Sequence, residues 1–205
     1  MTTEPEVFQL ADRALGRVVA RIAPDQWDVI LPAEGFTTSS RPEPPSLRAL
    51  VNYHAYDDAW VPDMVAGRTM AEAGAGKFDG DLLGDDPVAS FDAIVERACA
   101  AAAALTVTDL DRTAHLSFGD YTVREYFWQI NQFRGLRAYD IAQVIGVDAA
   151  LPEALVQGLW DELVPHVEEW RTIGIFPAAV PVPADAPLLD RLLGLTGRDP
   201  SAPAG

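Results

Sequence analysis

The chain has 205 residues, 49% of them hydrophobic, which supports one sizeable core and gives no reason to divide it. Its formal net charge of −16 argues against nucleic-acid binding, because an acidic surface repels a phosphate backbone. The longest apolar run is too short for a membrane span, and the opening residues lack a secretion-signal pattern. The single cysteine excludes an internal disulfide and a cysteine-based metal cluster.

These limits predict a cytoplasmic protein without a membrane partner, with one domain over residues 1–200 and a flexible tail at 201–205. The first helix is expected over residues 3–22. Its apolar residues share one face at helical spacing: Phe8, Ala11, Leu15, Val18, Val19 and Ile22. A proline-rich connection follows at 31–45.

Ser46 is the expected cap of a second helix that ends near Gly67. One face of this helix has the spacing of a core face but includes a histidine and a carboxylate: Leu47, Leu50, Val51, His54, Asp58 and Val61. Asp57 lies at the edge of that face. After a loop at 68–85, Asp86-Pro87 marks the start of a third helix, and 109–120 is predicted as a connection with a short extended piece.

The stretch from Glu125 to Gly146 predicts one long helix, begun by a capping box of Thr122 and Glu125. Steps of three and four place six residues on its expected inward face: Tyr126, Ile130, Phe133, Arg137, Ile141 and Val144. Arg137 is the misfit, because an unpaired buried guanidinium is very costly. It must therefore reach solvent, pair with a carboxylate or hold an anion.

The last long helix is predicted from Leu151 to about Arg171 with a bend at Pro165, and a short helix over 188–195 follows a proline-rich stretch. With no convincing series of strands, the pattern predicts an all-α fold. We expect a four-helix bundle with long crossover loops and an extended Pro-rich C-terminal wrap.

Long local motifs give the chain a family likeness: residues 78–88 (FDGDLLGDDPV), 115–120 (HLSFGD), 125–129 (EYFWQ) and 197–200 (GRDP). On these, the chain resembles the DinB-like, mycothiol-dependent maleylpyruvate isomerase superfamily, in its metal-binding-protein branch. The resemblance implies a bundle with a divalent metal held by three side chains. His54 matches the first ligand position, whereas Phe133 and Arg137 stand at the acidic and histidine positions. Phenylalanine has no lone pair to offer, and an arginine repels a cation, so no metal and no other cofactor is expected.

The catalytic candidates are His54, Asp58 and Arg137. His54 suits general acid–base work, or it is a core histidine satisfied by a carboxylate. Arg137 suits binding of a ligand carboxylate or phosphate, or it closes the centre in an ion pair with Asp57 or Asp58. The candidate substrate-binding residues are Asp57, Phe133, Tyr126, Trp60, Ile130 and Arg134.

Three functions compete. The first is a metal-independent isomerase, cyclase or lyase of specialised metabolism that acts on a small, anionic organic substrate in the bundle pocket. The second is a non-catalytic small-molecule-binding protein or degenerate relative, closed by the Arg137 pair. The third is a mycothiol-dependent transferase or isomerase with altered metal ligation. The sequence leaves the oligomeric state open, although homodimers are common among such bundles.

Overall fold

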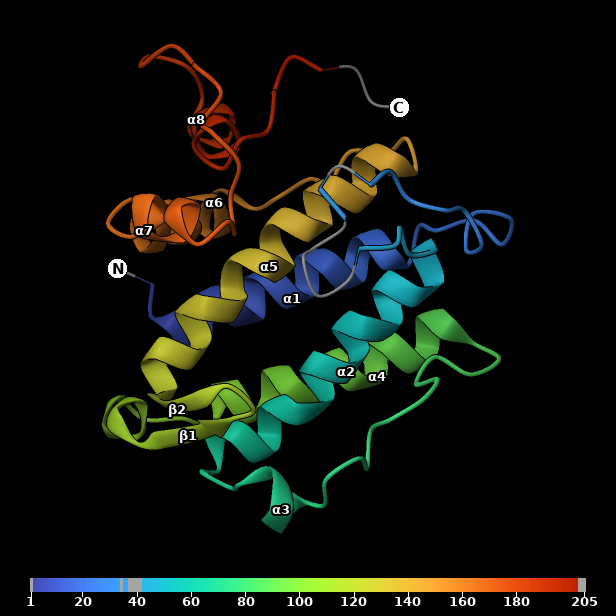
Figure 1. Cartoon of the computed structure of the whole chain (residues 1–205), viewed down its shortest axis with the longest axis vertical. Helices are drawn as coiled ribbons and strands as arrows, with labels where there is room; N and C mark the ends of the chain where they lie inside the picture. The colour runs from blue at the N-terminus through green and yellow to red at the C-terminus, as the bar shows by residue number, and fades with distance from the viewer. Residues whose placement is uncertain (1, 34, 37–41, 203–205) are drawn as a thin grey trace.

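The computed structural model describes residues 2–33, 35–36 and 42–202. The described chain is mainly helical (Figure 1). Its elements in order are α1 (Glu4–Val19), α2 (Leu47–Val65), α3 (Met70–Ala73), α4 (Pro87–Ala103), a 3-10 turn (Val107–Asp111), β1 (Thr113–Leu116), β2 (Gly119–Thr122), α5 (Val123–Val144), α6 (Glu153–Leu163), α7 (Val167–Thr172) and α8 (Leu188–Leu195). The expected all-α class is confirmed.

Side-chain caps begin the long helices where the sequence predicts them. The Ala49 N–H donates to Ser46 Oγ over 3.2 Å at the start of α2, and the Ala89 N–H donates to Asp86 Oδ1 over 3.0 Å at the start of α4. At the start of α5, Thr122 and Glu125 form the reciprocal capping box, with N···O distances of 3.1 and 2.8 Å. Each cap satisfies backbone N–H groups that have no partner within the helix.

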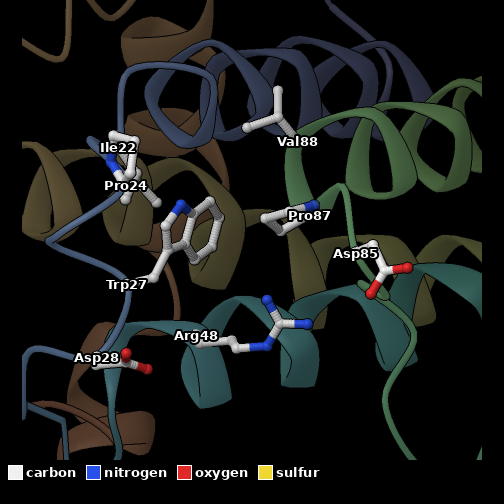
Figure 2. Close-up of a pocket in the computed structure, with 8 residues that line it drawn as sticks. All are labelled: Ile22, Pro24, Trp27, Asp28, Arg48, Asp85, Pro87 and Val88. Atoms are coloured by element: carbon white, nitrogen blue, oxygen red, sulfur yellow. The ribbon is translucent and has the colours of Figure 1, made fainter.

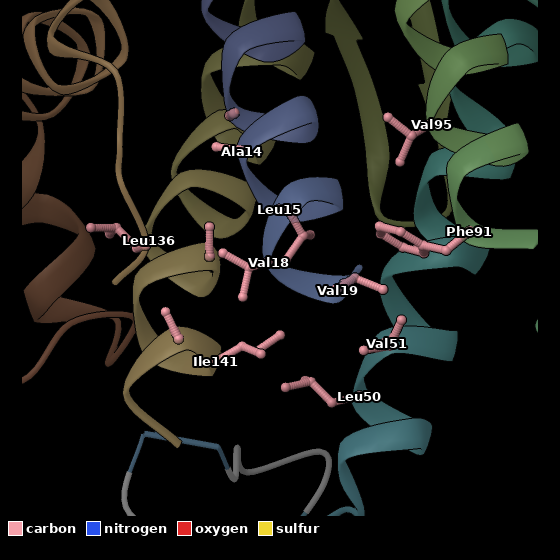
Figure 3. Close-up of a cluster of buried hydrophobic side chains, with 14 of the residues drawn as sticks. Ala14, Leu15, Val18, Val19, Leu50, Val51, Phe91, Val95, Leu136 and Ile141 are labelled. Carbon is pink, nitrogen blue, oxygen red and sulfur yellow. The ribbon is translucent and has the colours of Figure 1, made fainter. Parts of the chain in front are cut away.

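The main core surrounds α1, which packs against α5 on one side and against α4 on the other, while α2 packs against α4. Figure 3 shows Leu15, Val18 and Val19 of α1 between Leu136 and Ile141 of α5 and the side chains of α2 and α4. All are buried. The hydrophobic stripe predicted for the first helix is therefore the face that positions α5 against the rest of the core.

The short extended piece predicted within 109–120 is confirmed as β1, which forms an antiparallel hairpin with β2 in which Thr113 lies opposite Thr122. Two segments differ from the sequence-based expectation. The helix predicted over 151–171 is two helices, α6 and α7, because Pro165 has no N–H for the helical ladder. The 68–85 loop contains the short helix α3.

The C-terminal helices α6, α7 and α8 gather at one end of the molecule, beside the N-terminal start of α1 (Figure 1). Of the tail predicted to be flexible, residues 203–205 lie outside the described residues, whereas Ser201 donates to the carboxylate of Asp199 from its N–H and its hydroxyl. No helix in the described part of the chain combines the length and apolar character needed to cross a membrane.

Candidate functional site

The polar face predicted on α2 is confirmed. His54 is buried among Leu50, Val51 and Val61 of the same helix, and the Asp58 side chain has no exposed surface. Asp57 is half-buried, as its position at the edge of the face predicts. A histidine and a carboxylate therefore do lie on the inward face of α2.

The buried arginine of α5 is Arg134, and the expectation that Arg137 fills this position is wrong. The Arg134 side chain is 2% exposed, whereas that of Arg137 is 17% exposed. The guanidinium of Arg134 donates to Asp58 Oδ1 from Nε over 3.0 Å and from Nη2 over 2.7 Å. Asp58 therefore pairs with Arg134, one helical turn before Arg137, which was the expected partner of Asp57 or Asp58.

The error comes from the polarity of the buried stripe of α5. The buried face of α5 that meets α1 and α6 consists of Phe127, Asn131, Arg134, Ala138 and Ile141. It therefore includes an asparagine and an arginine. The sequence pattern favours the more apolar stripe that passes through Ile130 and Phe133. Phe133 is instead 38% exposed, so burial of polar groups with partners outweighs the simple apolar pattern here.

A third residue, Asp12 of α1, completes what we call the central ion cluster: Asp12, Asp58 and Arg134. Asp12 Oδ1 lies 3.8 Å from Arg134 Nε, and the Asp12 side chain is fully buried. The Phe8 ring lies 5.8 Å from the Arg134 guanidinium carbon. The cluster thus joins α1, α2 and α5 at the centre of the molecule.

The charges of the central ion cluster balance when Asp12 carries a proton. Burial and the neighbouring Asp58 carboxylate raise the pKa of Asp12 well above its ordinary value. Burial also raises the pKa of Asp58, but the hydrogen bonds and charge of Arg134 oppose that rise. Burial alone would lower the pKa of Arg134, and the carboxylates of Asp58, Asp57 and Asp12 raise it instead. With Asp12 protonated, the cluster holds one cation, one carboxylate and one neutral acid.

Sequence reasoning missed Asp12, although a signal for it exists. Phe8, Asp12, Leu15 and Val19 recur at steps of four, three and four, so Asp12 lies within the apolar stripe of α1. A carboxylate in such a stripe requires a buried partner.

Arg137 belongs to a different network, near the C-terminal end of α5. Its Nη1 lies 3.3 Å from Asp140 Oδ2 and donates to the Gly35 carbonyl over 3.0 Å, and its guanidinium lies over the Phe36 ring. Asp140 also accepts two hydrogen bonds from Arg198, over 2.7 Å from Nε and 2.8 Å from Nη2. This pairing attaches the segment after α8 to α5 and gives Asp140 a structural role.

The predicted substrate-binding residues do not surround one site. Tyr126 and Trp60 are buried in a second hydrophobic cluster, which Ile130 borders. Burial raises the pKa of Tyr126. Phe133 lies on another side of α5, where its ring centroid is 6.1 Å from that of Trp170. Arg134 joins the catalytic candidate Asp58 directly.

A partly buried carboxyl, Glu162, was also missed. Glu162 of α6 accepts a 2.9 Å hydrogen bond at Oε1 from Asn131 Nδ2 of α5, and Asn131 also donates to the Glu4 carbonyl of α1 over 3.0 Å. The remaining oxygens, Glu162 Oε2 and Asn131 Oδ1, are buried without a hydrogen-bond partner. Burial raises the pKa of Glu162 to about 8. Glu162 and Asn131 are 31 positions apart, so no local sequence pattern links them.

The residues at the positions implied by the resemblance do not fit a divalent metal. Phe133 offers no donor atom, and the Arg137 guanidinium is a cation already paired with Asp140. Within residues 2–33, 35–36 and 42–202, no group of three histidine, cysteine, aspartate or glutamate side chains is placed to hold a metal ion.

Comparisons with protein-family models, with curated proteins and with solved structures find no match to this chain.

Proposed function

We propose that the protein is a DinB-like four-helix bundle, with its Pro-rich C-terminal segment laid against it, that binds a small molecule and performs no reaction at its centre. The observation that carries this proposal is the burial of the central ion cluster. Asp12 and Asp58 are 0% exposed and Arg134 is 1% exposed, and the Arg134 guanidinium lies 2.7 Å from Asp58 and 3.8 Å from Asp12.

Catalytic groups must touch the substrate, and those of the central ion cluster have almost no solvent-accessible surface through which to do so. Their electrostatic arrangement suits a structural role, because one buried cation offsets one buried carboxylate. Arg134 supplies the closing ion pair that was expected from Arg137. The small molecule then binds elsewhere on the chain, and a cytoplasmic location and a homodimeric state stay predictions.

The experiment is urea denaturation of Arg134→Met, with Arg97→Met as the matched control on the exposed side of α4. Removal of Arg134 leaves Asp58 buried without its cation, so the free energy of unfolding should fall by about 3–5 kcal/mol. The control should change it by less than about 0.5 kcal/mol. An Arg134→Met protein with unchanged stability would contradict the structural role of the cluster.

The raised pKa of Asp12 beside Asp58 favours a second candidate, a metal-independent isomerase, cyclase or lyase. Two carboxyl groups held in different protonation states are a pattern of acid–base catalysis. In that case Asp12→Asn would abolish turnover of the substrate with little effect on folding, whereas a non-catalytic protein has no turnover to lose. The mycothiol-dependent candidate has no support from the donor set at His54, Phe133 and Arg137.

A further inference from the structure

A surface hollow of about 470 Å³ lies where the turn after α1 meets the first residues of α2 and α4. Figure 2 shows the residues that line it: Ile22, Pro24, Trp27, Asp28, Arg48, Asp85, Pro87 and Val88. The volume is in the range of sites for small organic molecules, about 300–1,000 Å³. The hollow shares no residue with the central ion cluster.

The wall around Trp27 is held in place by backbone hydrogen bonds. The Arg48 N–H donates to the Trp27 carbonyl over 2.9 Å, and the Leu47 N–H donates to the Val29 carbonyl over 2.9 Å. Trp27 is 9% exposed, and in Figure 2 its ring lies between Pro24 and Pro87. Because proline fixes its own backbone, this apolar wall needs little reordering to receive a ligand.

The polar groups of the hollow include donors and acceptors without partners. Arg48 is fixed through Nη2, which donates to Asp81 Oδ2 over 2.8 Å and to the Gly84 carbonyl over 2.7 Å. Its Nε and Nη1, like the Trp27 indole N–H, have no acceptor among the described residues. Asp28 and Asp85 are exposed, and neither side chain makes a hydrogen bond or ion pair with another described residue.

We propose that this hollow binds a small zwitterion with an ammonium and a carboxylate on an apolar body, the chemistry of a free apolar α-amino acid. The ligand carboxylate pairs with Arg48, and its ammonium pairs with Asp28 or Asp85. The apolar body packs against Trp27 and Pro87. A ligand without a carboxylate leaves Arg48 Nε and Nη1 without an acceptor, and a ligand without an ammonium leaves the Asp28 and Asp85 carboxylates without a cation. This inference rests on the proposed binding function and gives it a site.

The test is isothermal titration calorimetry with L-phenylalanine as the probe. Two comparators each lack one charge: 2-phenylethylamine has no carboxylate, and 3-phenylpropionate has no ammonium. The zwitterion should bind at least about tenfold more tightly than either comparator. No binding of L-phenylalanine at millimolar concentration, or equal binding of all three compounds, would overturn the proposal.

Variants of the hollow locate the binding. Asp28→Asn removes an exposed carboxylate that makes no hydrogen bond or ion pair with another described residue, so the fold should be preserved. Asp85→Asn is its counterpart on the other side of the hollow, and Arg48→Gln removes the cation. At least one aspartate variant and Arg48→Gln should weaken binding about tenfold. Asp92→Asn, an exposed change on α4 outside the hollow, is the control and should bind as the unmodified chain does. Unchanged binding in all three variants would refute the site. The structural role of the central ion cluster is decided separately, by the free energy of unfolding of Arg134→Met.

Discussion

Replacing Glu162 by glutamine should stabilise the protein, and increasingly so as the pH rises. In the folded chain burial raises the pKa of Glu162 from its ordinary value of 4.5 to about 8, so the carboxyl is protonated at neutral pH. A proton on Glu162 Oε2 makes that atom a hydrogen-bond donor. The available acceptor is Asn131 Oδ1, which is buried without a partner and belongs to the amide that already donates to Glu162 Oε1. Glutamine reproduces this neutral donor–acceptor pair at every pH.

The magnitude follows from proton linkage. Below pH 4.5 the carboxyl is protonated in both the folded and the unfolded chain, so its contribution to stability is fully present. Between pH 4.5 and about 8 the unfolded chain releases the proton and the folded chain keeps it, so the free energy of unfolding falls by about 1.4 kcal/mol per pH unit. At pH 7 the cost is about 3 kcal/mol, which Glu162→Gln removes.

The assay is urea denaturation of both proteins at pH 5, 7 and 9. Above pH 8 the folded chain carries an ionised Glu162 near the carboxylates of Glu4 and Asp161, and the stability difference reaches a plateau. Glu153→Gln, an exposed change on the same helix, controls for the loss of one negative charge. A stability difference between Glu162→Gln and the unmodified chain that stays constant from pH 5 to pH 9 would refute the buried neutral carboxyl.

Two further predictions concern packing and the C-terminal attachment. A Cβ on Gly158 would lie 2.5 Å from a methyl carbon of Val7, so Gly158→Ala should lower the free energy of unfolding by about 1–3 kcal/mol in urea denaturation. In the control Gly16→Ala, the added Cβ meets no atom within 4 Å, and the free energy of unfolding should rise by up to about 1 kcal/mol. Equal effects of the two changes would contradict the close approach of α1 and α6. Asp140→Asn weakens the two hydrogen bonds from Arg198 and should lower the free energy of unfolding by about 2 kcal/mol. Proteolytic cleavage after α8 should also become faster. An unchanged cleavage pattern would show that Asp140 does not hold this segment.

The starts of the long helices could be predicted from the sequence because caps act over short distances. Ser46, Asp86 and Thr122 each bond a backbone N–H three residues away. The inward face of α2 was also predictable, since His54 and Asp58 fit a stripe of apolar neighbours. Local spacing carries this information, so one sequence is enough to find it.

The partner of Asp58 could not be chosen from the sequence, because Arg134 lies 76 positions away from it. Both Arg134 and Arg137 are close to the inward side of α5, and only the position of α1 decides which one is buried. Asp12 of α1 lies beside Arg134, but this pairing itself depends on the contact between α1 and α5. Polar groups on a buried stripe lower its apparent hydrophobicity, so pattern-based reasoning selects the neighbouring stripe.

The packing of α1 against α5 has a consequence for the order in which the chain folds during synthesis. The end of α1 at Val19 precedes the start of α5 at Val123 by 104 positions, and a ribosome needs about 5–20 s to add that many residues. During this interval the apolar stripe of α1 and the Asp12 side chain have no α5 to cover them. The nascent chain therefore presents a hydrophobic helix to chaperones for seconds, and synthesis rate becomes a determinant of its yield.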